Sequence, residues 1–407
     1  INAMTSGTSW SVAIPESGDN RTAMQFVDFY GDGLPEAVVF YKNEAEFALR
    51  ICVYAKSGQS SYTEMCRIDG AGDRFVSADY TDLNGDGSLE FVVGMEYGSS
   101  AEYALKIYSL ANNTAALIMD TTSADRVITD MDGDGVSELL VVGVNESGNG
   151  MSVGMYRHAT GGSIALAYSA PLSYLPGTDA EIFTGKFNSN MRAVVFESSV
   201  TVEGVPYYVS DCVTYTSRSG LESLSFSELY GYSYSTLRTS DIMVADVNSD
   251  GFLELPLPAY GAEQKTDAFI NWYYYDSFGY LSLSCTTYTN FSGEGWYLVC
   301  PDAWLGTVYS VTKTPETGLR SIEFFTDYNS RNLSLLKLYV LSEDYVETSK
   351  PKDEWFTIAE AGGYMFCGEL PEGNTGQLPE GYLYATEAEV RGNFATTENG
   401  IPVFAGQ

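Results

Sequence analysis

The residues best suited to chemistry are acidic side chains that recur in a nine-residue loop. One copy runs from Asp130 to Glu138, with carboxylates at positions 1, 3, 5 and 9 and glycine at position 6. Oxygen atoms at this spacing suit a hard cation such as Ca²⁺, which takes about six to eight oxygen ligands. The glycine supplies the left-handed backbone turn that lets a short loop wrap round an ion. The pattern therefore predicts a structural Ca²⁺ site.

The spacing of the loops predicts a repeat. Position 1 falls at residues 28, 82, 130 and 246, so the intervals are 54, 48 and 116 residues. Because the last interval is twice 58, we expect a repeat without an acidic loop near residue 188. Residues 187–196 lie there and end in Ala-Val-Val-Phe, as residues 37–40 do. Five repeats of roughly 50–60 residues are typical of a β-propeller.

Three of the loops are full copies of the pattern, and the first is weaker because Tyr30 replaces the ligand at position 3. Position 7 would contribute its backbone carbonyl. The predicted calcium ligands are Asp82, Asn84, Asp86, Ser88 and Glu90 in the second loop, Asp130, Asp132, Asp134, Val136 and Glu138 in the third, Asp246, Asn248, Asp250, Phe252 and Glu254 in the fifth, and, more weakly, Asp28, Asp32 and Glu36 in the first. The alternative is a turn in which Asp and Asn side chains bond their own backbone and hold no metal.

Each repeat reads as four strands. In the third repeat the predicted strands are 126–129, 138–143, 151–157 and 164–169, and the first and fifth repeats show similar apolar runs separated by turns. Inner strands of a propeller blade are continuously apolar and outer strands alternate. We therefore expect a mostly β protein with a propeller of five four-stranded blades over residues 1–289.

The repeated Asp-x-[Asp/Asn]-x-Asp-Gly-x-x-Glu pattern, followed by a buried strand, resembles the FG-GAP/VCBS repeats of integrin-α-like propellers. The resemblance covers about residues 20–290 and is carried by the second, third and fifth loops. It implies Ca²⁺ at the blade edges and a secreted or surface-anchored protein. The chain is also similar to bacterial surface lipoproteins that carry a small C-terminal domain. At position 9 this chain has Glu where the family often has Asp.

The character of the sequence changes beyond residue 290, where the acidic loop no longer appears. Several strand-like runs precede one helix, which the capping box from Thr386 to Glu389 opens and in which Val390 and Phe394 share a face. We read residues 290–407 as a small C-terminal α+β domain. The alternative is that these residues form a sixth and a seventh blade.

Charge and hydropathy restrict the partners. The formal net charge is −33, from 54 acidic and 21 basic residues. Nucleic acids and anionic membranes bind through basic patches, so neither is an expected partner. No apolar run approaches the ~18 residues needed to span a bilayer. We expect any signal peptide to have been removed, a possible lipid anchor to lie upstream, and the protein to be secreted or held at the outer cell surface.

Cysteine and histidine give few leads to catalysis. Cys52 and Cys66 flank a predicted turn symmetrically, which is compatible with a disulfide across a hairpin and equally with two buried thiols. The single histidine, His158, ends a predicted strand, and no nucleophile, phosphate-loop or zinc motif is present. We therefore predict a non-enzymatic protein.

The expected activity is binding or adhesion, with a glycan, a cell-wall component or a protein as ligand. Trp272 and Tyr274 share one face of a predicted strand and would form either a ligand platform or packing between blades. The alternative function is a carbohydrate-active hydrolase or lyase that uses a pair of carboxylates on the propeller face.

Overall fold

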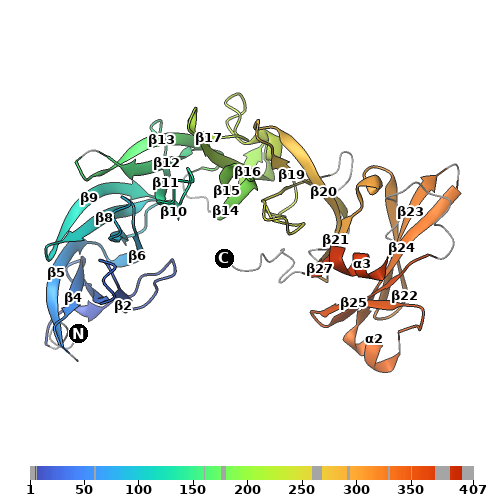
Figure 1. Cartoon of the computed structure of the whole chain (residues 1–407), viewed down its shortest axis with the longest axis horizontal. Coiled ribbons are helices and arrows are strands. Elements are labelled where there is room, and N and C mark those ends of the chain that lie inside the picture. Colours follow the sequence, from blue (N-terminus) through green and yellow to red (C-terminus); the bar gives the residue numbers. More distant parts are fainter. Residues whose placement is uncertain are drawn as a thin grey trace. The chain divides into compact units, whose positions relative to one another are not determined.

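The computed structural model (Figure 1) describes residues 5, 7–58, 61–159, 161–175, 180–258, 268–290, 294–328, 331–349, 351–371 and 386–396. The described residues form six antiparallel sheets, so the mostly β class is confirmed. Three of the sheets have four strands and three have five. We number the sheets from first to sixth along the chain.

The second and third sheets are hairpin meanders, and the first differs in that its two short N-terminal strands both pair with the third strand. The first consists of β1 (Ser11–Val12), β2 (Met24–Val27), β3 (Glu36–Asn43), β4 (Ala48–Lys56) and β5 (Tyr62–Ala71), the second of β6 (Arg74–Thr81), β7 (Glu90–Glu96), β8 (Tyr103–Ala111) and β9 (Thr114–Ser123), and the third of β10 (Asp125–Thr129), β11 (Glu138–Val144), β12 (Met151–His158) and β13 (Ile164–Leu172). The four strands predicted for the third repeat are therefore confirmed, with ends shifted by a few residues.

The remaining strands form three more sheets. The fourth consists of β14 (Glu181–Asn188), β15 (Met191–Val202), β16 (Val205–Thr216) and β17 (Gly220–Ser223), the fifth of β18 (Leu255–Pro258), β19 (Ala268–Tyr275), β20 (Leu281–Asn290), β21 (Trp296–Cys300) and β27 (Phe394–Thr396), and the sixth, in the order β22-β23-β24-β26-β25, of β22 (Val308–Glu316), β23 (Leu319–Tyr328), β24 (Arg331–Ser342), β25 (Phe356–Ala361) and β26 (Tyr364–Glu369). The fourth sheet is the predicted repeat without an acidic loop, because β14 and β15 are joined by residues 189–190 alone.

Helices are short. The predicted capping box is present, since the Thr386 hydroxyl accepts the Glu389 backbone N–H at 3.2 Å and α3 (Glu387–Asn393) follows. The prediction that Phe394 lies in this helix is wrong, because Phe394 begins strand β27 and stacks on Trp296 at 5.5 Å. A second helix, α2 (Glu343–Thr348), is capped by Ser342 and was not predicted. No helix in the described ranges is long and apolar enough to cross a bilayer.

Contacts divide the chain into two compact units. The first unit comprises residues 1–184, 192–200 and 211–235, and the second comprises residues 185–191, 201–210 and 236–407. The predicted border at residue 289/290 stays a prediction; it falls at the end of β20, which pairs with β21 in one sheet.

In the first unit, consecutive sheets bury their apolar faces against each other. One cluster joins the first and second sheets through T-shaped ring contacts such as Phe40 with Phe75 at 5.1 Å. A second cluster joins the second and third sheets through Leu105 and Leu139, which are completely buried. A third joins β11–β13 to Val194 and Phe196 of β15. Burial of apolar strand faces is thus the main stabilising contribution in this unit.

In the second unit, large aromatic residues form the core. Trp296 and Trp304 are almost completely buried and pack with Phe324 of the sixth sheet and Val390 of α3. A smaller cluster holds Trp272 with other residues of the fifth sheet. The α3 helix therefore completes a core that the strands alone leave open.

All six cysteines are free and buried. Cys66 lies opposite Val53, one residue away from Cys52, in the β4–β5 pairing. Because neighbouring residues of a strand point to opposite faces, the two thiols enter different clusters, Cys66 that of the first and second sheets and Cys52 that around Tyr41. A one-residue difference in register therefore separates the two thiols.

Candidate metal loops and a ligand pocket

The four acidic loops share one backbone scaffold. In every copy the first aspartate accepts the backbone N–H of the glycine at position 6, at 2.8, 2.8, 3.2 and 2.9 Å in the first, second, third and fifth loops. The aspartate at position 5 likewise accepts the N–H of position 7, at 2.8 to 2.9 Å. The loops therefore satisfy their own backbone, as the Asx-turn alternative requires.

The glutamate at position 9 anchors each loop to the core. Glu36, Glu90, Glu138 and Glu254 are at most 5% exposed, and each begins or directly precedes the strand after the loop. One carboxylate oxygen accepts the backbone N–H of position 2 at 2.8 to 3.3 Å. The position-2 side chains are themselves core residues, namely Phe29, Leu83, Met131 and Val247. The buried apolar residue at position 2 is a part of the motif that the sequence analysis missed.

Two positions of each loop need left-handed backbone. Position 6 is glycine throughout, with φ between 80° and 92°. Position 4 is glycine in the first three copies, but in the fifth loop it is Ser249 with φ 62°. A side chain at such a φ costs free energy because its Cβ crowds the following carbonyl.

In two of the four loops, three carboxylates converge closely enough for a metal ion. The ligand oxygens of Asp130, Asp132 and Glu138 lie within 4.8 Å of one another, and so do those of Asp246, Asp250 and Glu254. The carboxylates of the first and second loops do not converge in this way. In the first loop the Tyr30 hydroxyl donates to the Met65 sulfur at 3.7 Å. In the second, the Asn84 amide donates to Glu90 at 2.9 Å.

The fifth loop fits a cation best. None of the ion pairs in the described part of the chain involves its three carboxylates. The second oxygen of Glu254 accepts the Ser284 hydroxyl at 2.9 Å, so Glu254 is held in place by neutral partners. Burial raises the pKa of Glu254 to about 8, against the lowering effect of its hydrogen bonds. A bound cation would compensate the charge that burial makes costly.

The third loop is compensated by arginine. The Arg157 guanidinium, from β12, contacts Asp132 and also donates to Glu138 at 2.9 Å. Arg192 lies 3.2 Å from Asp130. A cation at the centre of these carboxylates would have to displace Arg157, so the residues present do not fit a resident metal here.

Neighbouring loops in the first unit touch. The Leu89 backbone N–H, from the second loop, donates to the Phe29 carbonyl of the first at 2.8 Å. Between the second and third loops lies a pocket of about 350 Å³, with Asn84, Arg157 and the exposed His158 in its wall. The lone histidine therefore lies beside the loops.

The predicted aromatic platform is divided between core and surface. Trp272 is completely buried, and its indole N–H donates to the Thr287 hydroxyl at 2.8 Å. The indole therefore lies in the core, where the packing alternative places it and where no ligand can stack on it. Tyr274 is half-buried, so it is the more accessible residue of the predicted pair.

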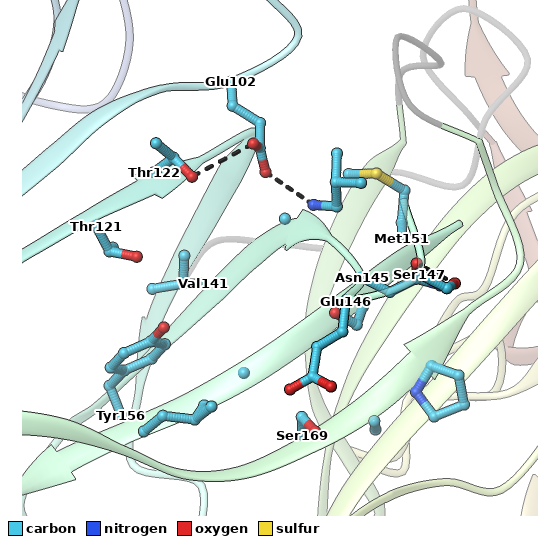
Figure 2. Close-up of a pocket in the computed structure, with 17 residues that line it drawn as sticks. Glu102, Thr121, Thr122, Val141, Asn145, Glu146, Ser147, Met151, Tyr156 and Ser169 are labelled. Atoms are coloured by element: carbon cyan, nitrogen blue, oxygen red, sulfur yellow. Dashed lines mark hydrogen bonds between the residues drawn. The ribbon is translucent and has the colours of Figure 1, made fainter. Parts of the chain in front are cut away.

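A larger pocket lies in the first unit, away from the acidic loops (Figure 2). It has a volume of about 560 Å³ and extends from β9 and Glu102, the residue before β8, to β11–β13. Glu102 crosses from the second sheet to the third, where it accepts the Val144 backbone N–H at 2.8 Å and the Thr122 hydroxyl at 3.3 Å. Glu146, in the β11–β12 loop, lines the same pocket (Figure 2).

Small residues in register make the hollow. Val141, Gly154 and Ser169 are directly opposite one another in β11, β12 and β13, and Gly143 is opposite Ser152 in the next row. A Cβ on Gly143 would lie 2.9 Å from Glu102, and one on Gly154 would lie 2.7 Å from Leu166. The glycines thus admit the side chains that form the walls. Small residues at alternate positions, such as Ser152 and Gly154 in β12, are the sequence signal for the pocket. This signal was not used to predict it.

Comparisons with known proteins leave the chain without an assigned family. No protein-family model matches it, and no curated protein matches it. Among solved structures, a protein from Lactobacillus plantarum is similar over 71% of this chain and 91% of its own, with 11% identity and a TM-score of 0.18. An exo-β-1,3-galactanase from Phanerochaete chrysosporium, solved with galactose, is similar over 85% of this chain and 81% of its own, with 9% identity and a TM-score of 0.24. TM-scores this low do not establish a shared fold, so the function must be argued from this chain's own residues.

Proposed function

We propose that this chain is a secreted or surface-anchored, non-enzymatic binding protein, built as a calcium-stabilised β-propeller of the FG-GAP/VCBS type, whose ligand is a glycan. The observation that carries the binding function is the pocket of Figure 2. The propeller is supported by sheets of four or five antiparallel strands that recur with the acidic loop. Calcium is supported by the convergent carboxylates of the fifth loop.

The chemistry of the pocket favours a neutral polyhydroxylated ligand. Its two charged lining residues, Glu102 and Glu146, are acidic, and none of the described residues that line it is basic. An anionic ligand would therefore be repelled. The other polar lining groups are the Asn145 amide and the hydroxyls of Thr121, Thr122, Ser147, Ser152, Ser169 and Tyr156. Such groups hydrogen-bond the hydroxyls of a sugar in both directions.

Apolar surface completes the match. Leu166 is 54% exposed in the pocket wall, and the Tyr156 ring lies beside it, since the two residues are paired across β12 and β13. The C–H face of a sugar ring packs on such surface while its hydroxyls meet the polar groups. The volume of about 560 Å³ falls in the usual range of ligand pockets.

The test is glycan-array binding by the purified chain, followed by calorimetry with the best ligand. We expect Glu146→Gln to weaken binding about tenfold, because hydrogen bonds to a charged group contribute roughly 1.5–3 kcal/mol. Ser169→Phe, which fills the pocket without changing its charge, should abolish binding. Glu181→Gln is the matched control, because Glu181 is exposed and outside the pocket. A blank array, or equal affinities for all variants, contradicts glycan binding at this pocket.

One observation favours the alternative of a carbohydrate-active hydrolase. The pocket is lined by two carboxylates, Glu102 and Glu146, and neither belongs to an acidic loop (Figure 2). Glycoside cleavage uses such a pair, one carboxyl group as acid and the other as base or nucleophile. Glu102, however, accepts hydrogen bonds at both oxygens, which suits a structural role. Release of reducing sugar that is lost in Glu146→Gln would establish the hydrolase, and bound glycan without turnover would support the binding protein.

A further inference from the structure

In the second, third and fifth loops, the second oxygen of the position-9 glutamate has a side-chain partner. In the second loop the partner is the Asn84 amide at 2.9 Å, and in the fifth it is the Ser284 hydroxyl at 2.9 Å. In the third loop it is the Arg157 guanidinium, whose Nε and Nη2 lie 3.2 and 2.9 Å from Glu138 Oε1. Among the four loops, which all lie in described parts of the chain, the third alone has a cationic partner at this oxygen.

Strand register explains how Arg157 reaches the loop. Glu138 begins β11, and Leu139 pairs with Tyr156 of β12. Because the strands are antiparallel, Glu138, which precedes Leu139, lies beside Arg157, which follows Tyr156. The corresponding tyrosine recurs in the other copies, in the pairs Ala37–Tyr54, Phe91–Tyr108 and Leu255–Tyr273. The residue after that tyrosine is Ala55, Ser109, Arg157 or Tyr274. The arginine is therefore specific to the third copy.

The guanidinium is held in place from several sides. Its carbon lies 5.3 Å from the centre of the Tyr215 ring, and it contacts Asp132 in addition to Glu138. The Arg157 side chain is 27% exposed, whereas Asp132 and Glu138 are 14% and 5% exposed. Because these contacts and its planar shape already fix the guanidinium, Arg157 loses little conformational freedom when it pairs with the loop. Arg192 compensates Asp130 in the same loop.

We infer that Arg157 is the built-in counter-ion of the third loop, which therefore closes without a metal ion, and that calcium acts at the fifth loop. The four carboxylates of the third loop match the calcium pattern most fully in the sequence, yet two guanidinium groups already pair with three of them, Asp130, Asp132 and Glu138. The calcium part of the inference rests on the proposed function, whereas the role of Arg157 does not.

Thermal unfolding in EDTA tests the role of Arg157. We expect Arg157→Gln to lower the melting temperature by on the order of 5 °C, because it leaves Glu138 and Asp132 without a cationic partner. The matched control is Arg50→Gln, since Arg50 also pairs with an aspartate, Asp69 at 2.5 Å, and also lies over an aromatic ring, that of Trp10 at 4.3 Å. Asp69 is far more exposed than Glu138, so the control should shift the melting temperature by about 1 °C. Equal shifts for the two variants would overturn the inference.

Two further variants keep the test decisive. Asp132→Asn should cost less in the Arg157→Gln background than in the wild-type chain, since the pair is already broken there. Additive effects in EDTA would count against the pairing. If Arg157→Gln does not fold, Arg157→Lys, which keeps the charge but not the fork, takes its place and should show the same coupling with Asp132→Asn.

Calcium addition tests which loop binds. Arg157→Gln should gain a larger calcium-induced rise in melting temperature than the wild-type chain, because it frees the third loop for an ion. The reciprocal variant Tyr274→Arg should lose the rise, as should Asp250→Asn. If Asp130→Asn reduces the wild-type rise as much as Asp250→Asn does, the third loop binds calcium and the inference is overturned. If the wild-type chain shows no rise at all, the calcium proposal fails, while the EDTA comparison still decides the role of Arg157.

Discussion

At the scale of single residues, a buried carboxylate holds a surface segment of the first unit on its sheet. Asp211 is completely buried and accepts hydrogen bonds from the Ser173 backbone at 2.8 Å, the Ser173 hydroxyl at 2.5 Å and the Ser233 hydroxyl at 2.5 Å. Ser233 lies between Tyr232 and Tyr234, of which Tyr234 stacks on Tyr230 at 4.5 Å. One carboxylate thus positions an exposed group of tyrosines.

Asp211 should make stability depend on pH. Burial raises the pKa of Asp211 to about 6, above the usual 3.8, so the folded chain binds this proton more tightly than the unfolded chain. The free energy of unfolding should therefore fall as pH rises from about 4 to about 6, by at most about 3 kcal/mol from this group. Urea unfolding at several pH values should show this component in the wild-type chain and not in Asp211→Asn. Parallel pH profiles would contradict it.

At the scale of elements, hydrophobic pattern predicted strands better than ends of helices. The strands of the third repeat were predictable from apolar runs between turn residues. Strands that are buried on both faces, such as β11 and β12, have nearly continuous apolar sequences. The end of α3 did not follow, since Phe394 leaves the helix to pair with Leu298 and stack on Trp296, contacts distant in sequence. The position of the acidic loops was likewise readable from spacing. The partner of Glu138 was not, because it depends on the register of a hairpin.

The fifth loop contains a residue with a strained backbone conformation, and a substitution can relieve that strain. Ser249 adopts φ 62° where the other loops have glycine. Ser249→Gly should stabilise the chain by up to about 1 kcal/mol, since the relief of left-handed strain outweighs the added freedom of the unfolded chain. Urea unfolding measures the change. Ser99→Gly is the control, because Ser99 is exposed and has no such φ, and should be neutral or destabilising. A loss of stability in Ser249→Gly would show that the serine makes a compensating contact.

At the scale of the whole molecule, charge opposes folding. The formal net charge of −33 produces self-repulsion, and the acidic loops concentrate part of it within single turns. The pocket of Figure 2 adds two further carboxylates to the first unit. Nothing in the acidic pattern marked that pocket, because its shape comes from glycines and serines in register on adjacent strands.

Calcium should therefore stabilise the chain measurably. With the ~10⁻⁴–10⁻³ M affinity typical of extracellular modules, 5 mM Ca²⁺ should add about 1–2 kcal/mol and raise the melting temperature by a few degrees relative to EDTA. Magnesium at equal concentration controls for ionic strength and should do less, because its octahedral geometry suits a flexible loop poorly. Identical melting curves in EDTA, magnesium and calcium would remove calcium from the proposed function.

The six buried thiols have a practical consequence. Burial raises the pKa of Cys66 to about 11 and that of Cys285 to about 12, so both are protonated and unreactive while their sheets are closed. A thiol reagent can label them only when the surrounding sheet opens. Since cysteines occur in β4, β5, β16, β20, β21 and β26, the labelling rate at each one reports the local opening of its own strand, without any probe being added to the chain.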